Sequence, residues 1–494
     1  MKEAPLTIAP RVLSLLSRVA GFFQENEIEG YVVGGFIRDT LLGRATADID
    51  IAMRADALKV AGDLAGVLAG RYVRLDELNQ VARIVLPGGG ELDFSTIRDG
   101  IRQDLALRDF TVNALALPLD EPGRGLEREA IVDPFSGTRD LERRIIRAVS
   151  PGIFQADGVR LLRAIRLAAE LDFQIEPETR ALIKRDAGLV APVAGERIRE
   201  EFLRILALPR AGDYIANLDA LGLLTAVIPE LGQARNVEQP VVHYWDVFRH
   251  SMETVSALGF LLHQAGYQFG RDELLSDVPW SSRIEAHFAR EVSHGSTRQA
   301  ILKLAGLLHD IAKPQTKTTD ETGRTRFLGH SQEGASVASA VLDRLRFSAR
   351  EIKLVGLLVT YHLRPGQLSQ QGLPSKRAIY RYFRDTGEAG IDVLFLSLAD
   401  HLAARGPRID MAQWREHTGL VRYVLQRYFE EQDRPSPVQL LDGHDIINIF
   451  GLSEGPLIGE LLEAAREAQA AGEIATREEA LKFVARRLAG GEAQ

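Results

Sequence analysis

The chain has 494 residues, more than one hydrophobic core usually supports, and this length predicts about two to four domains. Hydrophobic residues at 45% and charged residues at 26% exclude wholesale disorder, and the absence of cysteine excludes disulfides and thiolate metal sites. The formal net charge of −8 argues against a basic coat over the whole surface, although a local basic stripe is compatible with it.

The N-terminal stretch does not read as a targeting or membrane segment. It carries polar residues and no small-residue cleavage site, and no apolar run in the chain approaches the roughly 18 residues of a spanning helix. We therefore expect a cytoplasmic protein without a membrane partner. The sequence gives no indication of an obligatory protein partner.

The first part of the chain alternates between helical and strand-like patterns. A strand is expected in YVVGG and a helix in FIRDTLLGR, and residues 81–87 and 91–97 read as a hairpin across GGG. Further helices are expected over 11–27 and 56–70, and a further strand over 49–53. These elements predict a small mixed head.

From residue 145 onward the pattern is helical, with no convincing strands. The polar stretch 264–298 is interpreted as an insertion or mobile loop. The predicted fold class is α+β, a small mixed head followed by a long helical body. The predicted domains are the mixed head and three helical parts, over residues 1–145, 146–238, 239–410 and 411–494.

A glycine pair and an aspartate pair stand close together in GGFIRDTLLGRATADID. Gly34 and Gly35 allow a close approach of the backbone to a ligand, at the start of a helix whose N-terminus can hold phosphate. Asp48 and Asp50 are at i and i+2 of a predicted strand, which puts both carboxylates on one face. Such a pair can hold magnesium for an in-line displacement at phosphorus, so the stretch indicates a nucleotidyl-transfer site.

Four further stretches follow in order, LRDFTVNALAL, DPFSGTRDLERRIIRAV, ADGVRLLRAIRLAAEL and GERIREEFLRIL. Together the five resemble the motifs of the class II tRNA nucleotidyltransferases, or CCA-adding enzymes, and the bacterial poly(A) polymerases. The resemblance implies template-independent addition of C and A to the 3′ end of tRNA from CTP and ATP, with release of pyrophosphate. It implies Mg²⁺ ligation by Asp48 and Asp50, and nucleotide contacts by Gly35, Arg38, Arg108, Asp157, Arg160, Arg163 and Arg166, with Asp109 and Asn113 near the sugar.

Asp157 and Arg160 can also be interpreted from their chemistry. On a helix over residues 156–171 they lie at i and i+3 on one face, with Arg163 one turn further. A carboxylate accepts from an exocyclic amino group and a guanidinium donates to a ring nitrogen or carbonyl, which matches the Watson–Crick edges of C and A. The alternative is a solvated ion pair with no role in base selection.

Three departures from the family pattern bear on the product. Ala156 stands where the family usually has Glu, and Leu107 where it usually has Arg. Only DGIRQ separates ELDFSTIR from DLALRDFT, much less than the flexible loop of many complete CCA-adding members. This short segment resembles the specialised CC-adding enzymes, so CC-only addition stays open.

A second group of ligand-type residues begins near residue 243. His309 and Asp310 are adjacent in a hydrophobic stretch, where an unpaired buried carboxylate would be costly. A divalent metal such as Mn, Ni, Co, Mg or Fe would remove this cost and could activate water for attack on a phosphate ester.

The set His250, His309, Asp310 and Asp400 resembles the HD phosphohydrolase superfamily, and His330 and His362 are candidates for completing a two-metal site. His243 and His401 are interpreted as surface residues or as residues behind the ligands, and Lys313 as a solvated lysine.

The leading hypothesis is a tRNA nucleotidyltransferase with an HD phosphohydrolase domain. Within the transferase class, CC-only addition and A-only or poly(A) addition are alternatives. A second alternative is mainly an HD phosphohydrolase, acting on 2′,3′-cyclic or terminal phosphates, whose other half only binds RNA. A non-catalytic RNA-binding module is disfavoured, because it would retain two ligand sets without use.

Overall fold

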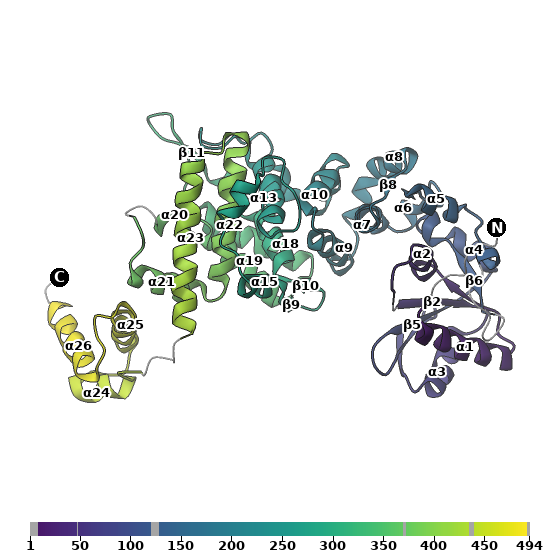
Figure 1. Ribbon diagram of the computed structural model, residues 1–494, viewed down its shortest axis with the longest axis horizontal. Helices are drawn as coiled ribbons and strands as arrows, with labels where there is room; N and C mark the ends of the chain where they lie inside the picture. The colour runs from purple at the N-terminus through teal and green to yellow at the C-terminus, as the bar shows by residue number, and fades with distance from the viewer. Residues whose placement is uncertain (1–7, 47, 120–127, 369–371, 434–438, 492–494) are drawn as a thin grey trace. The chain divides into compact units, whose positions relative to one another are not determined.

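The computed structural model describes residues 8–46, 48–119, 128–368, 372–433 and 439–491 (Figure 1). Two compact units divide the chain, Met1–Val193 with Leu218–Val227, and Ala194–Asn217 with Ile228–Gln494. Each unit is described by itself. Within the described ranges, every helix is too short or too polar to cross a lipid bilayer.

A six-stranded mixed sheet forms the head, in the order β3-β4-β5-β2-β1-β6. Strands β2 and β5 are parallel, and the other neighbouring pairs are antiparallel. The strands are β1 Gly30–Val33, β2 Asp48–Met53, β3 Arg71–Asp76, β4 Val81–Val85, β5 Glu91–Thr96 and β6 Ala116–Pro118, and the helices are α1 Pro10–Glu25, α2 Gly35–Leu41, α3 Ala57–Leu68, α4 Ile101–Ala106 and α5 Gly137–Arg143. The predicted elements of the head are confirmed, whereas β3 and β6 were not expected.

The alternation of β2 determines which of its side chains reach solvent. Ile49 and Ile51 are buried, whereas Asp48 and Asp50 are exposed on the opposite face. Helix α3 begins at the N-cap Asp56, whose side chain accepts from two backbone N–H groups, and packs on β3, β4 and β5. The carboxylates therefore point away from the apolar core of the head.

The rest of the first unit is helical. Its elements include α6 Ile153–Ala156, α7 Arg160–Leu171, α8 Pro177–Asp186 and α11 Leu223–Val227. A short parallel pair, β7 Ile145–Ile146 with β8 Gln174–Ile175, contradicts the prediction of no strands after residue 145. Each strand has only two residues, too few to show an alternating pattern, so the sequence did not predict this strand pair.

The second unit is built around α22 Ala389–Arg405, most of whose residues are buried. Helix α22 packs on α13 Val247–Leu261, α16 Arg298–Leu308, α19 Ala349–Tyr361 and α23 Met411–Gln432. Further helices of the second unit are α9 Gly195–Ala207, α12 Pro229–Gly232, α14 Asp272–Ser276, α15 Ser282–Ala289, α17 Lys313–Thr316, α18 His330–Arg344, α20 Arg364–Leu368 and α21 Lys376–Thr386. Helix α10 Ala211–Ala220 has residues in both units. Two small hairpins, β9 Glu291–Ser293 with β10 Ser296–Thr297 and β11 Lys317–Thr319 with β12 Thr325–Phe327, complete it.

The stretch 264–298 is not the mobile loop that its polarity predicted. It forms α14, α15, β9 and β10. Trp280 packs edge-on against Phe395 of α22 with ring centroids 5.9 Å apart, and the fully buried Trp414 donates from Nε1 to the carbonyl of Leu274 at 3.0 Å. A few large anchors, rather than a long apolar pattern, therefore hold this segment against the helical body.

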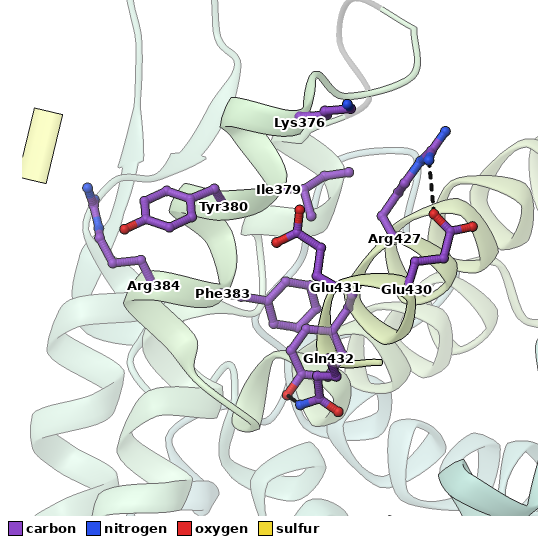
Figure 2. A pocket seen from close by; sticks show the side chains of 10 residues that line it. Lys376, Ile379, Tyr380, Phe383, Arg384, Arg427, Glu430, Glu431 and Gln432 are labelled. Atoms are coloured by element: carbon purple, nitrogen blue, oxygen red, sulfur yellow. Dashed lines mark hydrogen bonds and ion pairs between the residues drawn. The ribbon is translucent and has the colours of Figure 1, made fainter. Parts of the chain in front are cut away.

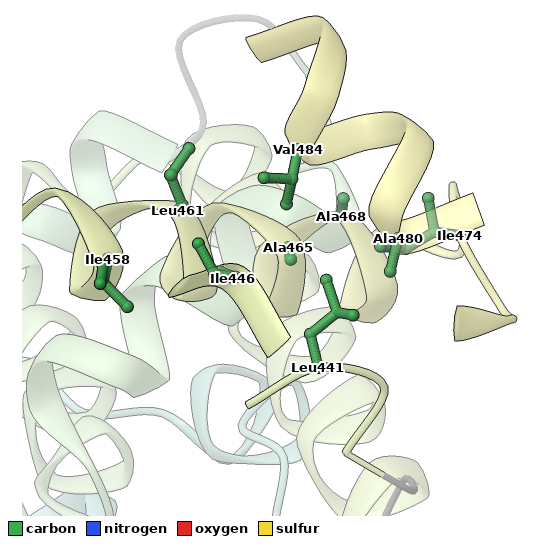
Figure 3. Close-up of a cluster of buried hydrophobic side chains, with 9 residues drawn as sticks. All are labelled: Leu441, Ile446, Ile458, Leu461, Ala465, Ala468, Ile474, Ala480 and Val484. Atoms are coloured by element: carbon green, nitrogen blue, oxygen red, sulfur yellow. The ribbon is translucent and has the colours of Figure 1, made fainter. Parts of the chain in front are cut away.

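The helical tail is confirmed as α24 Gly443–Phe450, α25 Pro456–Ala471 and α26 Arg477–Gly491. Side chains from all three helices form one buried apolar cluster (Figure 3), which contains Leu441, Ile446, Ile458, Leu461, Ala465, Ala468, Ile474, Ala480 and Val484. The charged, alanine-rich sequence thus contributes a small core at one face of each helix.

Candidate active sites

The two aspartates of β2 lie beside a third carboxylate on the neighbouring strand. Asp50 is the register partner of Asp93 in the parallel pair β2–β5. Arg83 on β4 binds Asp93 through two hydrogen bonds of 2.7 and 2.8 Å and also pairs with Glu91. The third carboxylate is therefore present next to the pair, and Arg83 holds it in place.

The carboxylates on this sheet face are crowded, and this crowding shifts the pKa of Asp50. One edge of the side chain is open to solvent, but desolvation by the surrounding protein raises its pKa, and the charges of Asp93 and Asp48 raise it further. Arg108 acts in the opposite direction. Because carboxylates crowded in this way are stabilised by a cation, Asp48 and Asp50 fit a divalent ion such as Mg²⁺.

The glycine pair leads directly from β1 into α2. Gly34 is the N-cap of α2 with φ of 77°, a backbone conformation that favours glycine. A Cβ atom at this position would lie 2.7 Å from Nη1 of Arg108 and 3.3 Å from Oδ2 of Asp50. Gly34 thus keeps open the space in which the arginine and the carboxylate meet at a helix N-terminus.

Arg38 is held on α2 by two neighbours. Its guanidinium donates to both carboxylate oxygens of Asp39 at 3.0 and 2.8 Å and to Oδ1 of Asn113 at 2.7 Å. Arg108 lies 3.4 Å from Asp104 one turn back along the chain. Both predicted nucleotide-binding arginines therefore have defined orientations, and Arg108 lies close to Asp50 at the Gly34 position.

Asp109 is buried and accepts three hydrogen bonds. They come from the backbone N–H of Phe110 at 2.7 Å, Nδ2 of Asn113 at 3.0 Å and Nη1 of Arg163 at 3.1 Å. Burial alone would raise the pKa of Asp109, but Arg163 and these hydrogen bonds lower it. Three predicted residues thus form one network that links the loop after α4 to α7.

Asp157 does not lie on a helix as predicted. Helix α7 begins only at Arg160, and Asp157 is extended with φ of −158° and accepts from the N–H of Val159 at 3.3 Å. Gly158 packs so close to the carbonyl of Leu189 that a Cβ atom would lie 2.1 Å from its oxygen, so glycine is the residue that fits at this position. Asp157 and Arg160 are nevertheless 3.9 Å apart, as the predicted pairing requires.

Arg160 and Arg166 differ in their surroundings. Arg160 donates to the carbonyls of Leu107 at 2.8 Å and Ile153 at 3.4 Å, near the loop that carries Arg108 and Asp109. Arg166 is buried and pairs with Glu170 at 2.6 Å on the same helix. The structure therefore brings Arg160 and Arg163 to the head and places Arg166 in an internal ion pair.

The predicted HD residues come together in the second unit. Helix α16 ends at Leu308, so His309 and Asp310 follow the helix rather than lying inside it. Nε2 of His250 lies 3.1 Å from Asp400, 3.2 Å from Nε2 of His309 and 3.4 Å from Oδ2 of Asp310. These four side chains converge on one point.

His330 and His362 converge on the other oxygen of Asp310. Their Nε2 atoms are 3.3 Å apart and lie 3.5 and 3.8 Å from Oδ1 of Asp310. Asp310 thus stands between two groups of imidazoles, an arrangement that could bridge two metal ions.

The histidine tautomers fit a metal. Nδ1 of His309, His330 and His362 lies 2.6–2.8 Å from a backbone carbonyl oxygen, to which it donates, so each Nε2 carries a lone pair aimed at Asp310. Burial lowers the pKa of His362 to about 4, which keeps that ring neutral as a ligand must be. Although burial opposes it, Asp310 raises the pKa of His309, so the cluster attracts positive charge.

Two further residues lie near this cluster, and for one of them, Lys313, the interpretation from the sequence was wrong. His243 groups with His250 and Asp400 as a potential ligand, and burial lowers its pKa to about 4. Lys313 is buried rather than solvated, and its Nζ contacts Asp310 at 2.6 Å and Gln239 at 2.7 Å. A lone histidine before a helix and a lysine after a His-Asp pair give no pattern that would reveal these positions.

The HD cluster opens into a cavity of about 550 Å³, lined in part by Arg324, Arg326, His401, Arg405 and His417. A separate cavity of about 340 Å³ lies between α21 and α23 (Figure 2). Phe383 stacks on Tyr428 beside it. None of the predicted site residues lines the second cavity. The first is the one that combines a cavity with convergent ligand-type side chains.

A carboxylate-bearing mixed sheet with a glycine–helix turn, joined in sequence to a helical His-Asp centre, defines a polymerase-type nucleotidyltransferase with an HD domain. Three family models match in the same order: poly A polymerase head domain over residues 30–147, probable RNA and SrmB-binding site of polymerase A over 172–234, and HD domain over 247–405. The predicted resemblance to this family, with a fused HD domain, is confirmed.

Two curated relatives cover nearly the whole chain. The A-adding tRNA nucleotidyltransferase of Deinococcus radiodurans is 34% identical over 92% of this chain and 94% of its own length. The CC-adding tRNA nucleotidyltransferase of Thermus thermophilus is 34% identical over 94% of this chain and 95% of its own length. The chain belongs to the tRNA nucleotidyltransferase family and is an enzyme of that class.

Solved structures share the fold. A CCA-adding enzyme in complex with ATP superimposes with a TM-score of 0.66 over 99% of this chain and 96% of that chain, at 24% identity. The Thermotoga maritima CCA-adding enzyme in complex with tRNA gives a TM-score of 0.63 over 97% and 96%, also at 24% identity. The α+β architecture predicted from the sequence is therefore confirmed.

Proposed function

We propose that this enzyme adds C and A nucleotides to the 3′ end of tRNA from CTP and ATP, without a template, and releases pyrophosphate. The observation that carries the proposal is the placement of Asp48 and Asp50 on one open sheet face, beside Gly34, Arg38 and Arg108. The names of the relatives support tRNA as the acceptor, and the similar structures include complexes with tRNA, ATP and CTP.

In this proposal each group has one task. Asp48 and Asp50 hold Mg²⁺, which would polarise the reacting phosphate and stabilise the leaving pyrophosphate. Arg38 and Arg108 bind triphosphate oxygens at the N-terminus of α2. Asp157 and Arg160 read the base, with Arg163 behind them, and Asp109 and Asn113 position the sugar.

We also propose the four-domain division over residues 1–145, 146–238, 239–410 and 411–494. The first two domains would perform the transfer, and the third would hold a divalent metal in the HD centre. The family models, which change from head to RNA-binding segment near residue 147–172 and to HD domain near 247, support this order.

CC-only addition is the second candidate, and one feature favours it. Strand β5 ends at Thr96 and α4 begins at Ile101, so a short turn alone connects the sheet to the helix that precedes Arg108. The segment that is long in many CCA-adding members is therefore replaced by a compact connection. Among the relatives, those of Thermus thermophilus and Geobacter sulfurreducens are named CC-adding enzymes.

The experiment that tests both candidates is extension of tRNA that ends at the discriminator base. The full chain is supplied with CTP, with ATP or with both, and products are resolved by length. A complete CCA end supports the leading proposal, a stop after CC supports the second candidate, and no extension contradicts both. Asp48→Asn and Asp50→Asn should abolish extension, whereas Asp63→Asn, an exposed carboxylate on α3, should not.

A second activity is favoured by the HD centre. Asp310 and the five proposed ligands around it, His250, His309, His330, His362 and Asp400, would hold one or two divalent ions. They would support hydrolysis of phosphate esters, including 2′,3′-cyclic and terminal phosphates. Hydrolysis of these substrates should require added Mn²⁺, Ni²⁺, Co²⁺, Mg²⁺ or Fe²⁺. Asp310→Asn should abolish it and leave tRNA extension intact, and loss of both activities in a folded variant would contradict two separate sites.

A further inference from the structure

The cavity at the HD centre has a wall that the predicted metal ligands do not explain. It is formed by Ser397, His401 and Arg405 of α22 and by His417 of α23. Arg405 follows Asp400 by five residues on α22, a displacement of roughly 7.5 Å along the helix axis. The wall thus stands beside the metal cluster and lines the same cavity.

Arg405 carries a positive charge that the protein only weakly compensates. Among the described residues it has no carboxylate within ion-pair distance, and its guanidinium donates to the neutral Oε1 of Gln413 at 3.2 Å. Desolvation lowers its pKa, with the more distant charges of Asp400 and Asp410 acting against this. A partly desolvated cation of this kind stabilises a bound anion.

The imidazoles of the wall add neutral polar groups. His401 and His417 stack with ring centroids 5.3 Å apart, and Ser397 Oγ lies 3.2 Å from Nε2 of His417. Nε2 of His401 is buried, and no described residue hydrogen-bonds to it. A buried polar atom without a protein partner, at the edge of a cavity, is suited to contact a ligand.

Two further arginines line the same cavity. Arg324 and Arg326 come from the hairpin β11–β12, and Arg326 is neutralised by Asp320 at 2.9 Å. The side chain of Arg324 has no ion-pair partner among the residues that the structure describes. Against these cations the lining offers the carboxylates of Asp310 and Asp400, which the metal cluster would use.

The rim of the cavity is apolar and exposed. Val242, Leu328 and Leu363 line it with 56%, 73% and 41% of their surface accessible. A cavity lined by cationic and by exposed apolar side chains matches a nucleotide, whose phosphate is anionic and whose base presents a flat apolar face. The volume of about 550 Å³ is sufficient for more than a phosphate group.

We propose that Arg405, with Arg324 and the Nε2 edge of His401, forms a phosphate-binding wall of the HD cavity and positions a nucleotide phosphate against the metal cluster. The inference rests on the proposed HD phosphohydrolase function for its catalytic consequence. The binding of an anion at the wall does not depend on turnover.

The test is binding of inorganic phosphate to the full chain, measured by calorimetry with and without Mn²⁺. Arg405→Gln should weaken phosphate binding about tenfold, and Arg405→Lys, which keeps the charge, should recover part of it. In hydrolysis of a nucleoside monophosphate, Arg405→Gln should raise KM about tenfold and change kcat far less.

Arg408→Gln is the matched control. Arg408 is exposed and close to Arg405, but it stacks over Tyr244 with its guanidinium 4.8 Å from the ring centroid and does not line the cavity. Unchanged phosphate binding in Arg405→Gln, or an equal loss in Arg408→Gln, would overturn the inference. If Arg405→Gln does not fold, Arg324→Gln on the exposed hairpin decides the question, and normal phosphate binding in that variant counts against the wall.

The two proposals fail separately. Arg405-dependent phosphate binding without hydrolysis in the wild type would remove the phosphohydrolase proposal and keep the wall. Metal-dependent hydrolysis that is abolished by Asp310→Asn but unaffected by Arg405→Gln would keep the phosphohydrolase proposal and remove the phosphate-binding wall.

Discussion

Arg163 and Asp109 form a salt bridge of 3.1 Å in which the carboxylate is almost fully buried and the guanidinium is about one-third exposed. The same carboxylate accepts from Asn113 and from the backbone of Phe110. One buried acid therefore fixes both an arginine of α7 and an asparagine of the head. Removing the acid would leave several donors without their acceptor.

Asp109→Ala is expected to lower the free energy of unfolding by roughly 3 kcal/mol, because buried donors lose a charged acceptor. The folded pKa of Asp109 lies below its unfolded value, so its contribution is present above about pH 4 and is lost as pH falls through the folded pKa. Urea unfolding at pH 7 and in acid measures this. Asp99→Ala, an exposed carboxylate nearby, should change little at either pH.

Gly34→Ala should reduce nucleotide transfer by more than about tenfold while the head stays folded. The new Cβ would meet Arg108 Nη1 at 2.7 Å and strain a residue with φ of 77°. Gly43→Ala separates these two causes, because Gly43 has φ of 67° but no atom within 4 Å of its Cβ position. Equal losses of activity in both variants would show that backbone strain alone, and not the crowding of Arg108, is responsible.

Because of Lys303, the free energy of unfolding should depend on pH in the alkaline range. Lys303 is fully buried on α16, donates to the carbonyl of Leu208 at 2.8 Å, and desolvation lowers its pKa from 10.5 to about 7. Between these values the unfolded chain binds more protons, so the free energy of unfolding should rise by roughly 2 kcal/mol between about pH 7 and pH 9. Chemical denaturation across this pH range should show that the free energy of unfolding rises in the wild type and in the control Lys59→Met. The rise should be absent in Lys303→Met.

A divalent metal should stabilise the second unit. A ligand that binds only the folded state at about 100 times its Kd adds roughly 2.7 kcal/mol. Thermal unfolding with Mn²⁺ or Ni²⁺ should therefore show a raised Tm that a chelator reverses. His362→Gln should weaken this response, whereas His294→Gln, whose ring is fully exposed between β9 and β10, should keep it. A full response in His362→Gln would exclude its role as a ligand.

The sequence predicted the carboxylate face because strand periodicity is local: Ile49 and Ile51 alternate with Asp48 and Asp50 in four consecutive residues. It also predicted the HD side chains by residue type. It did not predict that Asp157 lies outside α7, because the helical spacing of the residues continues through the break between α6 and α7. The burial of Lys313 beside Asp310 and the grouping of His243 with Asp400 are likewise tertiary facts that no local pattern contains.

The large anchors that hold α14 and α15 have an optical consequence. The chain has three tryptophans, Trp245, Trp280 and Trp414, and all belong to the second unit. Intrinsic indole emission excited near the red edge therefore reports on that unit alone, whereas far-ultraviolet circular dichroism senses helices in both. Comparing the two signals in one titration would separate the melting of the transferase head from that of the HD body without a label.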